Sequence, residues 1–389
     1  MDSFDAEINQ RLAAIREQGL YRELRRVDSP QLTRIQIGGE EFLNFSSNDY
    51  LGLANEPALK DAAIKAVEQF GAGAGASRLI CGSLSSYHEL EETLAEFKNA
   101  EAALSFSTGY AAAIGTICAL LGKENVIVLD KLVHACIVDA ARLSGARMRV
   151  FAHNDLNDLE DILKWTASLP DRKQVLVVTE SIFSMDGDQA PLREIVELKN
   201  KYGAWLMVDE AHATGLYGQN RRGLAEELGL AGQIEVQMGT LGKAVGSSGG
   251  YICGSRVLID YLINRARSFI FSTAPVPAAA AAATAGVHFI QSTAGENRSK
   301  LLWERVGQLR MLLKMPPTQS PSAIVPIMIG DETKAVEAAS ALRKHHCFVP
   351  AIRYPTVARG QARLRVTLTA THTLDDLHTL ANALHEIMK

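Results

Sequence analysis

The sequence lacks the features that would place the protein in an oxidising compartment or in a membrane. Its five cysteines are scattered and odd in number, with no C-x-x-C pair, which argues against a disulfide framework or a zinc site and indicates reduced thiols. The N-terminus has no apolar core of the signal-peptide kind. The most apolar stretch, residues 277–290, is too short and too rich in small side chains to span a bilayer. We therefore expect a cytoplasmic protein with no membrane partner and no metal site, and we expect 277–290 to form a packed helix.

A basic block is also missing. The 44 acidic and 40 basic residues give a net charge of −4, so no electrostatic footprint for nucleic acid is present and no nucleic-acid partner is expected. The 389 residues are 47% apolar, which is typical of a soluble globular protein. A chain of this length exceeds what one hydrophobic core usually spans, so two domains are expected.

Short β-rich runs alternate with helical segments through much of the chain. Several runs are continuously apolar, as expected for parallel strands that are covered on both faces. The segments between residues 107 and 240 are long enough for crossover helices. This pattern predicts an α/β fold with a mainly parallel sheet. The predicted strands are 102–107, 125–130, 147–151, 174–180, 205–210, 235–240 and 249–254.

The two ends of the chain have a different pattern. Residues 1–27 carry a helical period, and 40–53 resembles a short strand that runs into a loop. After about residue 290, helices and strands form what we expect to be a smaller α+β domain. The predicted division is an N-terminal helix and arm (1–45), a large cofactor-binding domain (46–285) and a small C-terminal domain (286–389).

Polar residues follow several of the predicted strands, at the edge where ligands gather in such sheets. The turn "STG" (107–109) opens a helix and could bind phosphate, although alone it is more often a plain helix cap. His134 and Ser184 would ordinarily be a packed histidine and a turn serine. Asp209 is different, because an acid that ends a buried strand needs a cationic or hydrogen-bonding partner.

Lys243 stands among glycines in "GTLGKAVGSSGGY" (239–251). Three interpretations are open for it: a grip on a phosphate, a desolvated amine that reacts with a carbonyl, or an ordinary polar turn. The nearby "DEAH" (209–212) also occurs in one helicase group. That function needs an upstream G-x-x-x-x-G-K-[ST] loop, which the sequence does not contain, so nucleotide hydrolysis is excluded.

Taken together, the elements predict a pyridoxal phosphate site. They are a phosphate-binding turn, a histidine that could stack on a ring, a buried aspartate and a lysine in a glycine pocket. The lysine would form a Schiff base with the cofactor, and the aspartate would keep the pyridine nitrogen protonated. The order of these elements along one α/β domain carries the prediction. The alternative is a binding module in which the glycine loop is only a scaffold.

The sequence resembles the α-oxoamine synthases, pyridoxal phosphate enzymes of fold type I, over nearly the whole chain. The resemblance rests on "NFSSNDYLGL" (44–53), "GAGASR" (73–78), "STGY" (107–110), "HAC" (134–136), "ESIFSMDGD" (180–188), "VDEAHATG" (208–215), the Lys243 segment and "RLRVTLTA" (363–370). Within the family, "FAHND" (151–155) and "RARSFIFSTAPVPA" (265–278) are most similar to the members that join L-alanine to a pimeloyl thioester in biotin synthesis. The nearest sister joins glycine to acetyl-CoA.

The resemblance implies roles for the cofactor residues. Lys243 would hold the cofactor and later act as acid and base at the substrate Cα, while Asp209 would pair with the pyridinium nitrogen. The other contacts would come from the Gly109 and Tyr110 backbone, the Thr240 hydroxyl, His134 stacked on the ring, and His212 with Ser184 or a neighbour at the phenolic oxygen.

The resemblance also implies the substrate contacts, which are Arg22, Asn48, His134, Thr356 and Arg365. Arg365 would clamp the amino acid carboxylate, a role that suits its guanidinium fork. In "RLRVTLT" the residues Arg363, Arg365 and Thr367 share one strand face, and we expect Arg363 to form only a surface ion pair.

The implied reaction is a decarboxylative condensation of L-alanine with pimeloyl-CoA or pimeloyl-acyl carrier protein. The family also implies a homodimer, in which "FSTAPVP" (271–277) would reach the partner's cofactor phosphate. Three departures from the family pattern stand out, and they are Cys136, Ala113, and Tyr354 with Arg359. The third lies near Thr356, where Arg353 or Arg359 could meet the far carboxylate of a pimeloyl chain.

Overall fold

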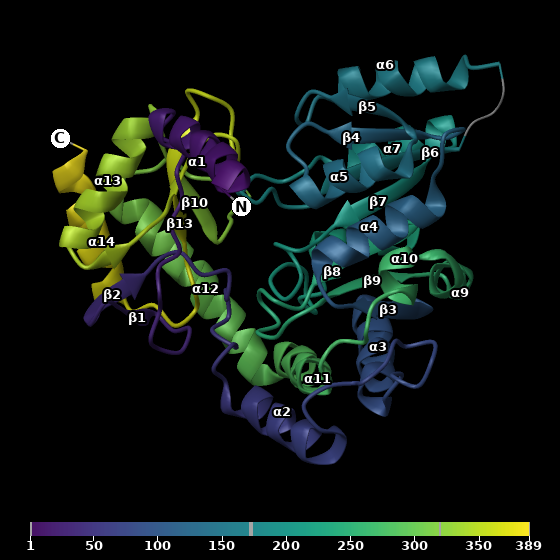
Figure 1. Cartoon of the computed structure of the whole chain (residues 1–389), viewed down its shortest axis with the longest axis horizontal. Coiled ribbons are helices and arrows are strands. Elements are labelled where there is room, and N and C mark those ends of the chain that lie inside the picture. Colours follow the sequence, from purple (N-terminus) through teal and green to yellow (C-terminus); the bar gives the residue numbers. More distant parts are fainter. Residues whose placement is uncertain (1, 171–173, 319, 389) are drawn as a thin grey trace.

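The computed structural model describes residues 2–170, 174–318 and 320–388. Figure 1 shows a large lobe built around one sheet and a smaller lobe that contains both ends of the chain. The helices α11 (Pro277–Gln291) and α12 (Thr293–Leu312) lead from the large lobe to the small one. Residues 277–290 therefore lie in a helix, as predicted.

The large lobe contains a seven-stranded sheet with the order β3-β9-β8-β7-β6-β4-β5. Only β9 runs antiparallel to its neighbours β3 and β8, and the other pairs are parallel. The predicted α/β fold with a mainly parallel sheet is confirmed. All seven predicted runs form strands: β3 (Ala102–Phe106), β4 (Val126–Asp130), β5 (Arg147–Phe151), β6 (Val175–Glu180), β7 (Trp205–Asp209), β8 (Val236–Thr240) and β9 (Gly250–Gly254).

Alternate residues of the strands feed two separate cores, one on each face of the sheet. In β4, for example, Val126 and Val128 belong to one core, while Ile127 and Leu129 belong to the other. The second core is covered by α4 (Gly109–Leu120), α5 (Ala135–Ser144), α9 (Arg256–Arg265) and α10 (Arg267–Ile270). The first is covered by α3 (Ser85–Lys98), α6 (Leu156–Ala167), α7 (Leu192–Tyr202), α8 (Leu224–Glu227) and α11. Residues Ala231–Gln233 form a short 3₁₀ turn, and α2 (Pro57–Phe70) packs on α11.

The small lobe is built from both chain ends. The hairpin of β1 (Arg34–Ile37) and β2 (Glu40–Asn44) is extended by β11 (Cys347–Phe348), which pairs parallel to β2. A second sheet has the order β10-β13-β12, formed by β10 (Ile324–Gly330), β13 (Ala362–Thr367) and β12 (Ala351–Ile352). The helices are α12, α13 (Glu332–Lys344) and α14 (Leu374–Ile387). The core on one face of the large sheet continues into this lobe through α12.

The N-terminal helix is shorter than its sequence period suggests. Helix α1 (Asp2–Glu17) ends just before Gly19, which has a φ of +67° that favours glycine. The prediction of helical structure over 18–27 is therefore wrong. This arm is held instead by Arg353, which donates hydrogen bonds to the carbonyls of Gly19 and Tyr21. The division into 1–45, 46–285 and 286–389 remains a proposal, with its second boundary inside α11.

Two further features concern the whole of the described chain. All five cysteines are free thiols. No helix among residues 2–170, 174–318 and 320–388 is both long enough and apolar enough to cross a membrane.

Candidate active site

The carboxyl ends of five strands lie at one edge of the large sheet. Strands β4, β6, β7 and β8 are parallel, and β3 has the same direction because β9 is antiparallel to both β3 and β8. The residues that follow these ends are the ones singled out in the sequence: Gly109 after β3, His134 after β4, Ser184 after β6, His212 after β7 and Lys243 after β8. The fold therefore gathers them at the edge where α/β sheets bind ligands.

The turn after β3 has the geometry of an anion site. Thr108 caps α4, since its hydroxyl accepts a hydrogen bond of 3.0 Å from the amide of Ala111. At the end of β8, the Thr240 hydroxyl donates to the Gly249 carbonyl at 3.0 Å. A Cβ on Gly250 would lie 2.5 Å from the Cα of Gly109, so only glycine lets β9 approach the start of α4 this closely. The first amides of α4 lie beside Thr240 and form a cradle that fits a phosphate, to which the Thr240 hydroxyl could donate by turning from the Gly249 carbonyl.

Lys243 is the start of a hydrogen-bonded chain. Its Nζ lies 2.8 Å from Nε2 of His212, and Nδ1 of His212 lies 2.5 Å from the hydroxyl of Tyr50. Tyr50 donates to Oδ1 of Asn48 at 3.3 Å. Tyr50 and Lys243 thus hold the two ring nitrogens of His212 and fix the orientation of the ring. Because burial lowers the pKa of His212, the lysine amine faces a neutral imidazole.

Burial dominates the electrostatics of this cluster. Burial lowers the pKa of Lys243, although the carboxylates of Asp209 and Glu180 oppose the shift. Burial likewise lowers the pKa of His212 well below its ordinary value, and the charges of Lys243 and Arg365 lower it further. An amine with a lowered pKa retains the free base that attacks a carbonyl. The site therefore fits a reactive lysine better than a phosphate-gripping one.

Two acids lie side by side at the ends of β6 and β7. Glu180 and Asp209 are partners in the strand register, and both are almost completely buried. Burial raises the pKa of both carboxyls, and the charge of Asp209 raises that of Glu180 further. Asp209 Oδ1 accepts a hydrogen bond of 2.9 Å from the amide of Ala211. A pyridinium nitrogen would supply the cation that a buried Asp209 carboxylate needs, so this group fits the cofactor.

His134 caps α5 at the end of the turn that follows β4. Its Nδ1 accepts a hydrogen bond of 3.2 Å from the amide of Cys136, whose sulfur lies 3.0 Å from the same atom. Burial lowers the pKa of His134, which favours the neutral ring, and Asp209 opposes this shift. The departure at Cys136 therefore places a thiol against the ring of His134.

Arg365 lies on β13 of the small lobe and contacts residues beside the Lys243 cluster. Its guanidinium donates to the Asn48 side chain at 3.0 Å, to the Ser184 carbonyl at 2.6 Å and to the Thr367 hydroxyl at 3.0 Å. The prediction that Arg363 forms a surface ion pair is wrong about its location, because the Arg363 side chain is buried. It does form an ion pair, with Asp186, whose side chain is 33% exposed. The Arg363 end of the pair is buried where β13 contacts the loop that carries Ser184.

The expected acyl contacts lie apart from this cluster. Arg22 donates to the Thr356 hydroxyl at 3.5 Å, and both side chains are exposed. Among the hydrogen bonds of residues 2–170, 174–318 and 320–388, none joins this pair directly to Lys243, Asp209 or His212. The exposed Tyr110 side chain donates to Asp139 on α5, so only the backbone of Tyr110 is left to face the cradle.

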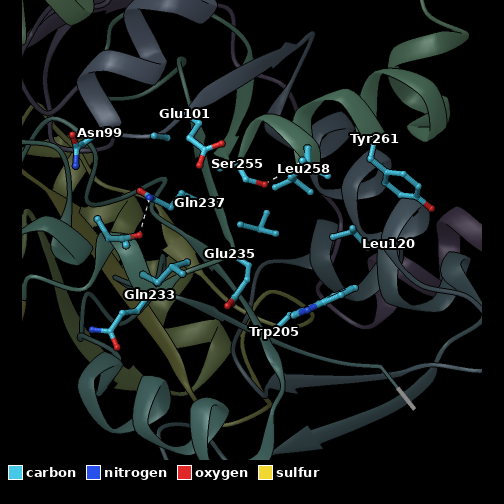
Figure 2. A pocket seen from close by; sticks show the side chains of 17 residues that line it. Asn99, Glu101, Leu120, Trp205, Gln233, Glu235, Gln237, Ser255, Leu258 and Tyr261 are labelled. Carbon is cyan, nitrogen blue, oxygen red and sulfur yellow. Dashed lines mark hydrogen bonds between the residues drawn. The ribbon is translucent and has the colours of Figure 1, made fainter. Parts of the chain in front are cut away.

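A separate cavity of about 600 Å³ lies at the opposite edge of the sheet (Figure 2). Its lining includes Trp205 and Val236, the first residues of β7 and β8, with Leu258 and Tyr261 from α9. None of the predicted site residues lines it. Among the described residues, no group of three or more histidine, cysteine or acidic side chains is arranged to hold a metal ion.

The fold and the site define a class of protein, and comparison with known proteins agrees. The chain belongs to the aminotransferase class I and II family, which matches residues 40–384. It is 46% identical over 381 residues to the 8-amino-7-oxononanoate synthase of Geobacter sulfurreducens, with 97% of each chain covered. It is 43% identical over 386 residues to the enzyme of that name from Thermoanaerobacter pseudethanolicus, covering 98% of this chain and 96% of the relative.

Solved structures extend the similarity to other α-oxoamine synthases. A serine palmitoyltransferase from S. paucimobilis, with a PLP–myriocin aldimine bound, has a TM-score of 0.91 at 30% identity and covers 100% of this chain and 98% of its own. The 8-amino-7-oxononanoate synthase of Francisella tularensis has a TM-score of 0.74 at 26% identity, with 90% and 99% covered. The predicted resemblance to the α-oxoamine synthases is confirmed.

Three site residues were missed in the sequence. Tyr50 and Glu180 lie inside quoted motifs, and Glu180 ends an apolar strand just as Asp209 does. The argument that singled out Asp209 therefore applied to Glu180 as well. Tyr50 gave no such signal, because only the fold brings the 44–53 loop against His212. The third, His153, lies in "FAHND" and had no assigned role.

Proposed function

We propose that this chain is a pyridoxal phosphate-dependent acyltransferase that condenses L-alanine with a pimeloyl thioester and releases carbon dioxide, the 8-amino-7-oxononanoate synthase reaction of biotin synthesis. The observation that carries the chemistry is the Lys243 amine, held 2.8 Å from His212 at the sheet edge beside Asp209. The observation that favours this member of the family is the near-complete coverage of relatives with that name at 46% and 43% identity.

Different residues of the site would hold different parts of the cofactor. When bound, pyridoxal phosphate supplies an electron-accepting ring that stabilises negative charge at the alanine Cα. The cradle of Gly109, Tyr110 and Thr240 would hold its phosphate, and Asp209 would hold the proton on its ring nitrogen. Lys243 would bind it covalently, with His134 against the ring and His212 and Ser184 at its edge.

Substrate binding and proton transfer also use residues of this chain. Arg365, fixed by Asn48 and the Ser184 carbonyl, orients the alanine carboxylate. Lys243 Nζ takes the proton from Cα and later returns one, a role that its lowered pKa favours. The buried Tyr50 excludes water from the far side of His212 and fixes the orientation of its ring.

The exposed Arg22, with Thr356, would meet the far carboxylate of a pimeloyl chain, since a guanidinium suits a carboxylate. Arg353 is engaged with the carbonyls of Gly19 and Tyr21, and it positions the arm that carries Arg22. Arg359 lies over the Tyr354 ring at 4.4 Å. The carrier of the acyl group is CoA or acyl carrier protein.

The protein acts as a cytoplasmic homodimer in this proposal, without a nucleic-acid or membrane partner. Two segments support it, because 73–82 and 271–277 are joined by the Ser77–Thr273 bridge and expose apolar side chains. These side chains are Leu79, Ile80, Phe271 and Val276. A second subunit would cover this patch, and light scattering at the working concentration would reveal an active monomer if the proposal is wrong.

The test of the reaction is a substrate matrix. Alanine, glycine and serine are each paired with pimeloyl-, acetyl-, succinyl- and palmitoyl-CoA, and thiol release is measured. We expect the highest kcat/KM for alanine with pimeloyl-CoA. The amino acid preference will be smaller than the acyl preference, because one methyl group discriminates by only about 10–200-fold. A preference for glycine with acetyl-CoA would assign the chain to glycine C-acetyltransferase and leave the Lys243 chemistry intact.

A further inference from the structure

The motif "FAHND" lies beside the site without a role in the proposed reaction. His153 follows β5, the edge strand next to β4. Its Nδ1 lies 2.9 Å from Oδ1 of Asp130, and its Nε2 lies 2.7 Å from Oδ2 of Asp188. The imidazole therefore bridges two carboxylates that are 58 residues apart in the sequence.

This geometry requires a protonated ring. A neutral imidazole has one nitrogen that can only accept, and it would turn that lone pair toward a carboxylate oxygen. Burial lowers the pKa of His153, but the hydrogen bonds and charges of Asp130 and Asp188 outweigh burial and raise the pKa to about 10. The bridge is thus an imidazolium with a carboxylate on each side.

The two carboxylates belong to loops that carry site residues. Asp130 is the last residue of β4, and its Oδ1 also accepts from the amide of Leu132 at 2.7 Å, in the turn that leads to His134. Asp188 closes the loop after β6, where the Phe183 amide donates to the Asp188 carbonyl at 3.0 Å. Ser184 lies inside that loop.

Asn154 makes a second tie between the same two loops. Its amide donates to Oδ2 of Asp130 at 2.9 Å, and its side chain donates to Asp188 at 3.0 Å and to the Gln189 carbonyl at 3.2 Å. The uncharged ring of Phe183 packs edge-on against His153, with centroids 4.4 Å apart. The charged groups that face His153 are therefore Asp130 from β4 and Asp188 from the loop after β6.

We propose that His153 is a positioning residue, a charged clamp that fixes the loop carrying His134 relative to the loop carrying Ser184. The inference rests on the proposed cofactor, because these loops matter only if His134 and Ser184 face a bound ring. Both ring nitrogens of His153 are taken up by the two carboxylates. His153 acts by holding the ends of the adjacent strands β5, β4 and β6 in one arrangement.

The clamp has a defined pH dependence. The folded pKa of about 10 lies above the ordinary histidine value, so the stabilisation is complete below the ordinary value and is lost as the pH rises through about 10. At neutral pH His153 is protonated and both hydrogen bonds of the clamp are formed. Removing one carboxylate should lower the pKa of His153, so the bridge should lose its charge at a pH closer to neutral.

The ring state is tested first, on the cofactor-free protein. With ¹⁵N-labelled histidine, we expect both ring nitrogens of His153 to be protonated at about pH 8, where an isolated histidine is neutral. In Asp188→Asn, His153 should titrate at a lower pH than in the parent. A neutral His153 ring at about pH 8 in the parent protein would overturn the proposal whether or not the protein binds pyridoxal phosphate.

The positioning role is tested on the reconstituted enzyme. Asp188→Asn keeps the shape of the bridge and the inner pair with Asp130, so it should fold even if His153→Gln does not. We expect cofactor affinity to fall by roughly 10-fold, since one hydrogen bond of the bridge loses its charged acceptor, and the circular dichroism of the bound cofactor to change. The alkaline limb of the kcat profile should move toward neutral pH.

The control is His378→Gln, an exposed histidine on α14, which should leave all three readouts unchanged. If Asp188→Asn lowers only the melting temperature, and leaves affinity, dichroism and the alkaline limb as in the parent, the role is purely structural and the positioning proposal is wrong. Failure of the parent protein itself to bind pyridoxal phosphate would refute the proposed function and, with it, the positioning role. The protonated bridge would still stand on the ring measurement.

Discussion

The two ends of the active site are built in different ways. At the cofactor end, Lys243, His212, Tyr50 and Asn48 form a continuous chain with contacts of 2.5–3.3 Å, and Tyr50 is completely buried. At the proposed acyl end, the exposed Arg22 and Thr356 share one hydrogen bond of 3.5 Å. The side chains of the cofactor end are therefore preorganised by their mutual contacts to a greater extent than those of the proposed acyl end.

This contrast agrees with the similarity to enzymes that take different acyl groups. The cofactor end is made by strand ends of the sheet. A serine palmitoyltransferase matches 100% of this chain at a TM-score of 0.91, so the fold around both ends is shared. The proposed acyl end is made by the 18–27 arm and the 353–360 loop, which lie outside the large sheet. Substitutions should therefore have large effects on rate at the first end and small effects on binding at the second.

The largest effect is expected for Asp209→Asn. The substitution keeps the shape but removes the charge that would hold a proton on the cofactor ring, so kcat should fall on the order of 10³-fold or more, with weaker cofactor binding. Steady-state kinetics at saturating cofactor measure this, with Asp161→Asn on the surface of α6 as the matched control. Turnover near that of the parent protein would rule out the electron-accepting role of the cofactor ring.

An intermediate effect is expected for Tyr50→Phe. Removing the hydroxyl leaves Nδ1 of a buried His212 without its partner, which costs about 1–3 kcal/mol of stability, and the orientation of the ring is no longer fixed. We expect kcat to fall by about 10-fold and the free energy of unfolding to drop within that range. Tyr261→Phe removes an exposed hydroxyl bonded to Ala119 and serves as the control. Unchanged values in both assays would mean that the hydrogen-bonded chain does not set the state of His212.

The smallest effect is expected for Arg22→Ala. An exposed charge contributes at most about 1 kcal/mol, so KM for pimeloyl-CoA should rise by roughly 5-fold while kcat stays near that of the parent. Arg11→Ala on α1 removes an exposed arginine elsewhere and is the control. A fall in kcat without a change in KM would show that the two ends are not separate, and would contradict the comparison.

The sequence predicted the residues of the cofactor end better than it predicted the contacts between distant segments. The polar residues at strand ends predicted the cofactor end, because parallel strands bring their carboxyl ends to one edge whatever the details of packing. The buried state of Arg363 was not predictable, since it depends on β13 lying beneath the Ser184 loop. Tyr50 and the bridge at His153 were missed for the same reason. Each contact joins segments more than 20 residues apart, and no local pattern encodes it.

The most direct test of the account is where the cofactor attaches. Purified protein is reconstituted with pyridoxal phosphate, reduced with borohydride, digested and examined by mass spectrometry, with Lys65→Ala as a control that keeps the site. We predict a yellow protein that carries the reduced cofactor on the peptide containing Lys243, and loss of this label in Lys243→Ala. A colourless protein with no label, or a label retained on another lysine in Lys243→Ala, would contradict the account.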